Sequence, residues 1–284
     1  MCGFRPLPSI ASSLKQTPEF AALIPQPIQD TFLSLSTSST PTGPQEKSAL
    51  RDLFEAVVTT NEGACKAQLN TLIERYKKGA LREGERQDLA DLVMQCNTHF
   101  PGDIGLFCVF LLNYVTLEPG EAIFLGAGEP HAYVSGECIE CMANSDNVIR
   151  AGLTPKLRDI PNLISTLTYT ASTPTKHYVS PSPFSSTTAT GSSSTLYDPP
   201  IPEFSVVQLK LAPGAEESHR PVMGPSIMIV TDGEGVVRWE LEGREERKLD
   251  IGLGDVFFIG AGTKVRFEGK DEEFVAYRAF VEVD

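Results

Sequence analysis

Most of the side chains capable of chemistry lie in one stretch of the chain. Residues 128–133 read GEPHAY, residues 137–141 read ECIEC, and Arg150 and Lys156 follow shortly after them. A neutral imidazole placed just after a tight glycine turn is a suitable ligand for zinc or iron. A single histidine is more often a structural residue with satisfied hydrogen bonds, so the spacing alone leaves both interpretations of His131 open.

Two kinds of residue near His131 are candidates to contact a sugar or to move a proton. Tyr133 lies two positions after His131 and therefore shares its face of an extended strand. Its hydroxyl could bind a sugar, although a tyrosine in the core or at its rim is the simpler interpretation. Glu137 and Glu140 fall on opposite faces of a regular strand, so only one of them is expected to face His131.

Cys138 and Cys141 form a Cys-x2-Cys pair, a spacing used in zinc and redox sites. No second pair or partnering histidines follow at the spacing of a zinc ribbon, and positions three apart in a strand point to opposite sides. We therefore expect buried thiols here and not a joint metal site. The six cysteines are scattered through the chain, which favours reduced thiols in a cytoplasmic protein.

Arg150 and Lys156 are notable because the chain is otherwise acidic. Asp and Glu number 37 against 24 Lys and Arg, a net charge of -13. A guanidinium presents a rigid fork of donors with a permanent charge, which suits a phosphate or a developing enediolate. A salt bridge within the fold is the alternative for Arg150.

The composition limits the classes of function. The 284 residues are enough for about two domains, and 41% of them are hydrophobic, as in globular proteins. The net negative charge disfavours partners such as nucleic acid or an anionic membrane surface. No apolar run reaches the roughly 18 residues of a membrane span, and the first residues do not resemble a secretory signal.

The elements expected to position these residues change along the chain. Apolar residues recur at helical spacing in residues 45–100, which predicts three helices. From Phe107 to Leu117 the chain is dense in apolar and β-favouring residues, and short strands between glycine and proline turns are predicted after residue 200. A Ser/Thr/Pro-rich insert, residues 170–202, separates the two β regions and is expected to be a surface loop.

An internal repeat connects the two β regions. Residues 119–131 and 253–265 both contain a glycine, an acidic residue, four apolar residues and Gly-Ala-Gly, and the copies end at His131 and Val265. This pattern resembles the second motif of the cupin superfamily, although Gly126 stands for its proline and Ser135 for its asparagine. The repeat therefore predicts two cupin-type jelly rolls, of which only the first has a metal-binding type of residue.

A longer resemblance covers nearly the whole chain. Residues 120–156, GEAIFLGAGEPHAYVSGECIECMANSDNVIRAGLTPK, resemble the signature segment of type I mannose-6-phosphate isomerases, and CGFRP at 2–6 and PGDIG at 101–105 resemble other segments of this family. The resemblance implies a zinc-dependent aldose–ketose isomerase that interconverts mannose 6-phosphate and fructose 6-phosphate through an enediolate and supplies GDP-mannose synthesis and glycosylation.

The resemblance also implies roles for individual residues. It implies that His131 is a zinc ligand, that Arg150 is catalytic, that Glu140 is an acid for proton transfer and that Lys156 lines the pocket. Tyr133 is added here as a substrate-binding candidate. The small-molecule partner implied is a sugar phosphate.

The departure from the family pattern is equally specific. The family takes its other zinc ligands from a Gln-x-His pair and a Glu that precede the CGFRP segment, and here Met1 stands directly before Cys2. We therefore expect an N-terminally truncated chain with an incomplete zinc site and little or no activity. A non-catalytic cupin-like protein that binds a sugar phosphate or serves as a partner subunit is the alternative.

The expected fold is α+β, with one partial and one degenerate cupin jelly roll and an inserted helical module. The expected segments are a remnant of the N-terminal cupin region (1–33), a helical module (34–100), a first cupin half with the active-site segment (101–169), the insert (170–202) and a degenerate second jelly roll (203–284).

Overall fold

The computed structural model describes residues 1–145, 148–184, 193–240 and 245–283. These residues form two compact units. The first unit comprises Met1–Leu117, Leu125–Gly136 and Asp146–His177, and the second comprises Glu118–Phe124, Glu137–Ser145 and Tyr178–Asp284. The fold is mixed helix and antiparallel sheet, so the α+β prediction is confirmed.

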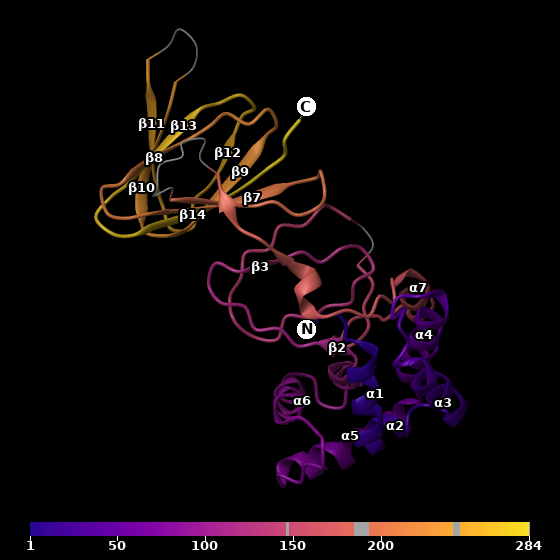
Figure 1. Cartoon of the computed structure of the whole chain (residues 1–284). Helices are drawn as coiled ribbons and strands as arrows, with labels where there is room; N and C mark the ends of the chain where they lie inside the picture. Colours follow the sequence, from indigo (N-terminus) through magenta and orange to yellow (C-terminus); the bar gives the residue numbers. More distant parts are fainter. Residues whose placement is uncertain (146–147, 185–192, 241–244, 284) are drawn as a thin grey trace. The chain divides into compact units, whose positions relative to one another are not determined.

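The first unit is mainly helical (Figure 1). Its elements are β1 (Cys2–Phe4), α1 (Leu7–Gln16), α2 (Pro18–Ala21), α3 (Gln26–Leu35), α4 (Pro44–Val58), α5 (Glu62–Lys77), α6 (Gln87–His99), the 3-10 helix η1 (Ile104–Phe110), β2 (Leu112–Asn113), α7 (Ile160–Thr166) and the 3-10 helix η2 (Pro174–His177). Helices α4, α5 and α6 confirm the three helices predicted between residues 45 and 100. Helices α1 to α3 lie earlier in the chain than that prediction reached.

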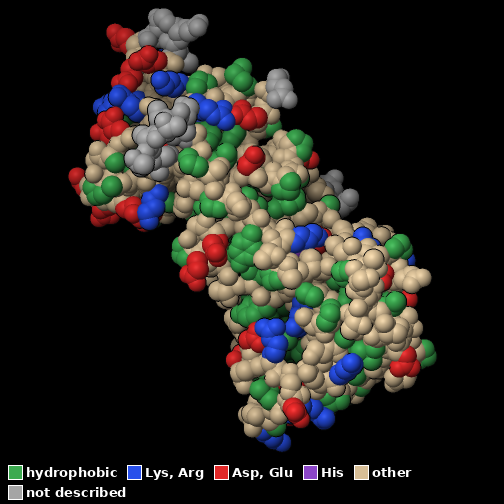
Figure 2. Space-filling view, in the orientation of Figure 1, with side chains coloured by type: hydrophobic (Ala, Val, Ile, Leu, Met, Phe, Trp, Pro, Cys, Tyr) green, Lys and Arg blue, Asp and Glu red, His purple; other side chains and the backbone are tan. Residues whose placement is uncertain are grey.

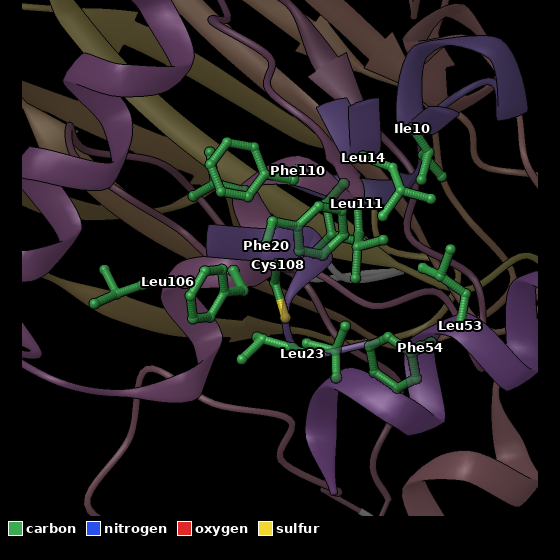
Figure 3. Packing of buried hydrophobic residues seen from close by; sticks show 14 of the residues in the cluster. Ile10, Leu14, Phe20, Leu23, Leu53, Phe54, Leu106, Cys108, Phe110 and Leu111 are labelled. Carbon is green, nitrogen blue, oxygen red and sulfur yellow. The ribbon is translucent and has the colours of Figure 1, made fainter. Parts of the chain in front are cut away.

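The helices of the first unit close around a single apolar core. The stripe of α4 that includes Leu53 and Phe54 is fully buried, and Figure 3 shows these two residues in the same cluster as Phe20 of α2 and Phe110 of η1. Phe20 and Phe110 lie with ring centroids 5.3 Å apart. This core fixes the helical frame on which the candidate site segments are held.

The apolar run that begins at Phe107 forms a helix and not a strand. Residues Ile104–Phe110 make η1, every one of them is buried, and only Leu112–Asn113 is extended, paired with β1. The Asp103 side chain begins η1 by accepting a hydrogen bond from the backbone N–H of Gly105. A short, continuously apolar segment does not distinguish a buried strand from a buried helix, and this explains the wrong prediction.

The second unit is built from antiparallel strands (Figure 1). They are β3 (Ala122–Ile123), β4 (Tyr178–Val179), β5 (Ser182–Pro183), β6 (Ser194–Tyr197), β7 (Ser205–Leu211), β8 (Glu216–His219), β9 (Ser226–Asp232), β10 (Glu234–Trp239), β11 (Arg247–Gly252), β12 (Val256–Ile259), β13 (Val265–Gly269) and β14 (Phe274–Phe280). One sheet has the order β11-β10-β13-β8 and another the order β12-β9-β14-β7-β6-β5, and β3 pairs with β4. Alternate residues of these strands, such as Met228, Val230 and Phe267, fill the core between the sheets.

The internal repeat is confirmed by the backbone. Gly120 and Gly254 have φ angles of 92° and 88°, and Gly128 and Gly262 have φ angles of 74° and 73°. Only glycine adopts this region without strain, so both copies need glycine at both turns. After the second turn each copy enters a paired segment, at His131 in the first copy and at Val265 in the second.

Charged side chains are mixed on the visible face of the molecule, where Figure 2 shows acidic and basic groups interspersed and not gathered by sign. Among the described residues, no helix combines the length and the apolar character that crossing a bilayer requires.

Candidate active site

The segment that carries His131 is held by a glycine turn. Gly128 has a φ of 74°, and a Cβ on it would lie 2.6 Å from the carbonyl oxygen of Thr166. The carbonyl of Gly128 also accepts a hydrogen bond of 3.1 Å from the N–H of Thr168. A side chain at position 128 would therefore push apart two backbone segments that support the site.

Residues 130–132 pair with the start of the chain. The N–H of Gly3 donates to the carbonyl of Pro130 at 2.9 Å, and the N–H of Ala132 donates to the carbonyl of Met1 at 2.9 Å. Cys2 and His131 form an antiparallel bridge between these bonds. The backbone of His131 is therefore fixed to β1, which is itself paired with β2.

The His131 ring has a defined orientation. Its Nδ1 lies 3.0 Å from the carbonyl oxygen of Glu129, and because a carbonyl only accepts, Nδ1 carries the proton. Nε2 is then the ring nitrogen left to bind a metal or a polar ligand. The residue is exposed, and its ring centroid lies 6.0 Å from that of Tyr133, which is 59% exposed. The expected proximity of these two side chains is therefore present.

Glu129 is a supporting residue that the sequence analysis missed. Its side chain is buried, and its Oε1 accepts hydrogen bonds from Lys176 Nζ at 2.5 Å and from Thr168 Oγ1 at 3.2 Å. Its Oε2 lies under Gly3, where a Cβ would stand 3.2 Å away. The carboxylate thus fixes the residue whose carbonyl orients His131. The signal in the sequence was an acidic residue set between a turn glycine and a proline.

The loop that carries Arg150 and Lys156 is fastened to the helical frame by Asp103. Asp103 Oδ1 accepts from the N–H of Leu153 at 2.8 Å as well as from Gly105. Leu153 has a φ of 53°, in the left-handed region. A Cβ on Gly152 would lie 2.6 Å from the Cα of Gly105, so the two glycines allow the backbones to touch. Asp103 was also missed, although PGDIG had been noted as a family segment.

The two cations on this loop differ in exposure. Arg150 is half-buried and Lys156 is exposed, with its backbone N–H donating to Thr154 Oγ1 at 3.2 Å. Neither side chain forms an ion pair with any residue that the structure describes. Both charges are therefore available to an anionic ligand as far as the described residues are concerned.

Glu140 belongs to the second unit, whereas His131, Tyr133, Arg150 and Lys156 belong to the first. Residues 137–145 contain no regular strand, so the argument that Glu137 and Glu140 face opposite sides does not apply. Glu140 is exposed.

The prediction of two buried thiols in this segment is wrong for one of them. Cys138 is exposed and Cys141 is partly buried, and burial raises the pKa of the Cys141 thiol. All six cysteines are free, and the other four are buried. Burial raises the pKa of Cys65 to about 11 and that of Cys108 to about 12, which keeps both thiols protonated and unreactive.

The described residues do not by themselves make a zinc site. No group of three or more His, Cys, Asp or Glu side chains with metal-binding geometry occurs among them. A catalytic zinc is held by about three protein ligands. Here the Nε2 of His131 is suitably presented, while the nearby carboxylate of Glu129 is already engaged by Lys176.

Comparisons with known proteins give a consistent result. The sequence model described as "Phosphomannose isomerase type I, helical insertion domain" matches residues 23–112, and "Phosphomannose isomerase type I C-terminal" matches residues 194–238. The mannose-6-phosphate isomerase of Cryptococcus neoformans is 47% identical over 256 residues, which cover 89% of this chain and 56% of that protein.

Two yeast proteins and a bacterial structure match essentially the whole chain. The mannose-6-phosphate isomerase of Saccharomyces cerevisiae is 40% identical, covering 99% of this chain and 65% of that protein, and that of Schizosaccharomyces pombe is 38% identical, covering 100% and 67%. The crystal structure of the Salmonella typhimurium enzyme, described as bound to substrate and zinc, superposes with a TM-score of 0.76 at 27% identity and covers 100% of this chain and 63% of that one.

The antiparallel sheets, the repeated glycine turn and the helical insertion define a cupin-type protein that carries the helical insertion of the type I phosphomannose isomerases. The chain belongs to the type I phosphomannose isomerase family. The predicted resemblance and the cupin fold are therefore confirmed. The chain spans 56% to 65% of the length of the first two relatives that it matches.

Proposed function

We propose that the active-site segments of this chain serve a mannose-6-phosphate isomerase, which interconverts mannose 6-phosphate and fructose 6-phosphate. The observation that carries the proposal is the match over the entire chain to enzymes of that name, at 38% to 40% identity. A related structure described as bound to fructose 6-phosphate and zinc supports a sugar phosphate as the ligand. The mannose 6-phosphate formed by the proposed reaction would enter GDP-mannose synthesis. The free thiols support a cytoplasmic location.

The proposed chemistry moves a proton between two neighbouring carbons of the sugar through an enediolate. Such a step needs a positioned acid–base group and a cation near the developing oxyanion. We assign the proton transfer to Glu140 and the charge stabilisation to Arg150. Lys156 and Tyr133 are assigned to binding, Lys156 at the phosphate and Tyr133 at the sugar hydroxyls, so that remote contacts hold the reacting carbons in place.

The His131 imidazole is proposed as a metal ligand, with Nε2 toward the metal because Nδ1 is bound to the carbonyl of Glu129. One suitable ligand among the described residues is fewer than the about three that hold a catalytic zinc. We expect the 284-residue polypeptide by itself to bind zinc weakly and to isomerise mannose 6-phosphate slowly or not at all.

Substrate binding and turnover should be measured separately on this polypeptide. Isothermal titration with fructose 6-phosphate is expected to show binding that Arg150→Met weakens about tenfold, through the loss of a charge-assisted contact. The matched control is Arg51→Met on the exposed face of α4. Equal binding by the wild-type chain and by Arg150→Met would contradict the assignment of Arg150. A zinc content near one per chain together with rapid turnover would contradict the expectation about the metal.

A further inference from the structure

The first unit contains a cavity that shares no residue with the candidate active site. Its volume is about 140 Å³, and it lies between α1 and the turn that leads into α6. Polar side chains dominate its lining: Arg5, Ser9, Ser12, Ser13, Gln16 and Arg86. Several water molecules would fit in this volume, so the cavity is large enough for a small polar ligand.

Arg5 is the buried charge of the cavity. The residue is only 6% exposed, and the one side-chain hydrogen bond that it makes to a described residue is long, from Nη1 to Ser13 Oγ at 3.3 Å. It forms no ion pair with a described residue. Burial, together with the nearby positive charge of Arg86, lowers its pKa to about 10. A guanidinium has five N–H donors, and Arg5 lines the cavity, so a ligand bound there could be the partner that a buried charge normally has.

Helix α1 supplies the hydroxyl groups of the cavity. Ser9, Ser12 and Ser13 follow at i, i+3 and i+4, and this spacing places them on one face of the helix. Gln16 extends the same face by one turn, and its amide lies against Gly84, where a Cβ would stand 2.2 Å from Gln16 Nε2. Gly84 has a φ of 82°, so the turn closes over the amide because this residue has no side chain.

The acidic group on the cavity wall is already bound. Glu85 also lines the cavity, but Arg75 binds both of its carboxylate oxygens, and Thr17 and Tyr76 donate to Oε1. Arg75 also pairs with Glu19, so both carboxylates of this network are bound to Arg75 and neither forms an ion pair with Arg5. Arg86 pairs with Asp88, and its side chain is 58% exposed at the mouth of the cavity.

We propose that this cavity is a binding site for a small tetrahedral oxyanion of the phosphate class. The guanidinium of Arg5 provides the buried donors, the hydroxyls of Ser9 and Ser12 provide rotatable donors, and Arg86 contributes a second positive charge at the opening, whereas the Ser13 hydroxyl donates to the carbonyl of Ser9. The arrangement matches the donors that phosphate groups accept from proteins.

Protection of arginines from phenylglyoxal, mapped by peptide mass spectrometry on the whole chain, tests the site directly. Inorganic phosphate is expected to slow modification of Arg86 at least about threefold, because the bound anion engages its guanidinium. Arg82, which is exposed on the same turn and does not line the cavity, is the matched control and should react at one rate throughout. Arg150 is read in the same experiment, so binding at the candidate active site is distinguished from binding here.

Two variants and a second salt complete the test. Arg5→Gln is expected to abolish the protection of Arg86. Ser12→Ala removes one hydroxyl without opening the core and is expected to weaken the protection, so it tests the site even where Arg5→Gln does not fold. Ser34→Ala, on the exposed face of α3, should leave it unchanged. Sulfate should protect as phosphate does, and chloride should not. Equal reaction of Arg86 with and without phosphate, or equal protection by chloride, would overturn the proposal.

Discussion

The carboxylate of Asp103 and the backbone N–H of Leu153 are joined by a hydrogen bond of 2.8 Å that spans fifty residues of the chain. The same oxygen accepts from Gly105 at the start of η1. One side chain therefore determines both where a buried helix begins and where the Arg150 loop is placed. The geometry of the candidate site depends on this residue, although it has no proposed part in the chemistry.

Replacement of Asp103 is expected to loosen the loop. Asp103→Ala leaves two backbone donors without a partner and should lower the free energy of unfolding by about 2 kcal/mol. Asp103→Asn keeps an oxygen acceptor and should lose less. Chemical denaturation compares the free energies of unfolding of the two variants, and hydrogen exchange of residues 150–156 compares how well the loop is held. An Ala variant as stable and as well protected as the Asn variant would show that the bond does not hold the loop.

A methyl group at Gly152 should be costly because two backbones touch there. The added Cβ would lie 2.6 Å from the Cα of Gly105, and overpacking of this kind costs about 1–3 kcal/mol. Gly260→Ala is the matched control, since the nearest atom to its Cβ is Thr263 Oγ1 at 3.6 Å. Thermal unfolding of the two variants is the measurement. Similar melting temperatures would argue against the close contact.

The Glu129–Lys176 pair, whose carboxylate is buried, should be more important for stability than a pair in which both side chains are exposed. Lys176→Met leaves a carboxylate whose side chain is 7% exposed without its cation, and we expect a loss of about 2 kcal/mol. Lys66→Met breaks the exposed pair with Glu62 and should cost no more than about 0.5 kcal/mol.

The double variant Glu129→Gln, Lys176→Met completes a thermodynamic cycle for the same pair. Because the charge and its partner are removed together, the double variant should lose less free energy of unfolding than the two single variants lose in sum. Additive losses in urea denaturation would mean that the two side chains do not interact.

Acid should destabilise the second unit through His219. Burial, together with the charge of Arg278, lowers the pKa of this imidazole from 6.5 to about 3. Its nitrogens are bound to Ser194 and Arg278, and the rings of Phe184 and Phe267 pack against it. The unfolded chain takes up a proton below pH 6.5 and the folded chain does not, so His219 contributes a loss of stability of about 1.4 kcal/mol per pH unit as the pH falls from 6.5 toward 3.

Variants at two histidines isolate this contribution from that of the carboxyl groups. His219→Gln should unfold more easily at neutral pH but lose stability less steeply between pH 6.5 and 4, as measured by denaturant titrations. His99→Gln, at the exposed end of α6, should keep the wild-type slope. Parallel slopes for the wild-type chain and His219→Gln would refute the assignment.

The sequence predicted those parts of the fold that are encoded locally. Apolar residues at helical spacing placed α4, α5 and α6, and glycine and proline turns between apolar runs predicted short strands after residue 200, where β7, β9, β12 and β14 occur. The glycine repeat located His131, because the need for a positive φ is visible in a single residue type. The arginine and lysine of the candidate site stood out against an acidic chain.

Contacts between distant residues could not be predicted in the same way. Glu129 reaches Lys176 across 47 residues and Asp103 reaches Leu153 across 50, and neither spacing has a local signature. Strands β8, β11 and β13 contain several charged residues, which weakened their apolar pattern. The helical start of the Phe107 run depends on the cap supplied by Asp103.

The two copies of the glycine turn allow two different side chains to be compared in the same backbone setting within one chain. Both keep the same pair of left-handed glycines, yet one presents an exposed imidazole and the other a valine that is 3% exposed and packs into the core. The turn therefore keeps the same glycine conformations whether histidine or valine follows it. It follows that the glycines identify the architecture of such a half, and that only the residue after the turn indicates whether that half can take part in chemistry.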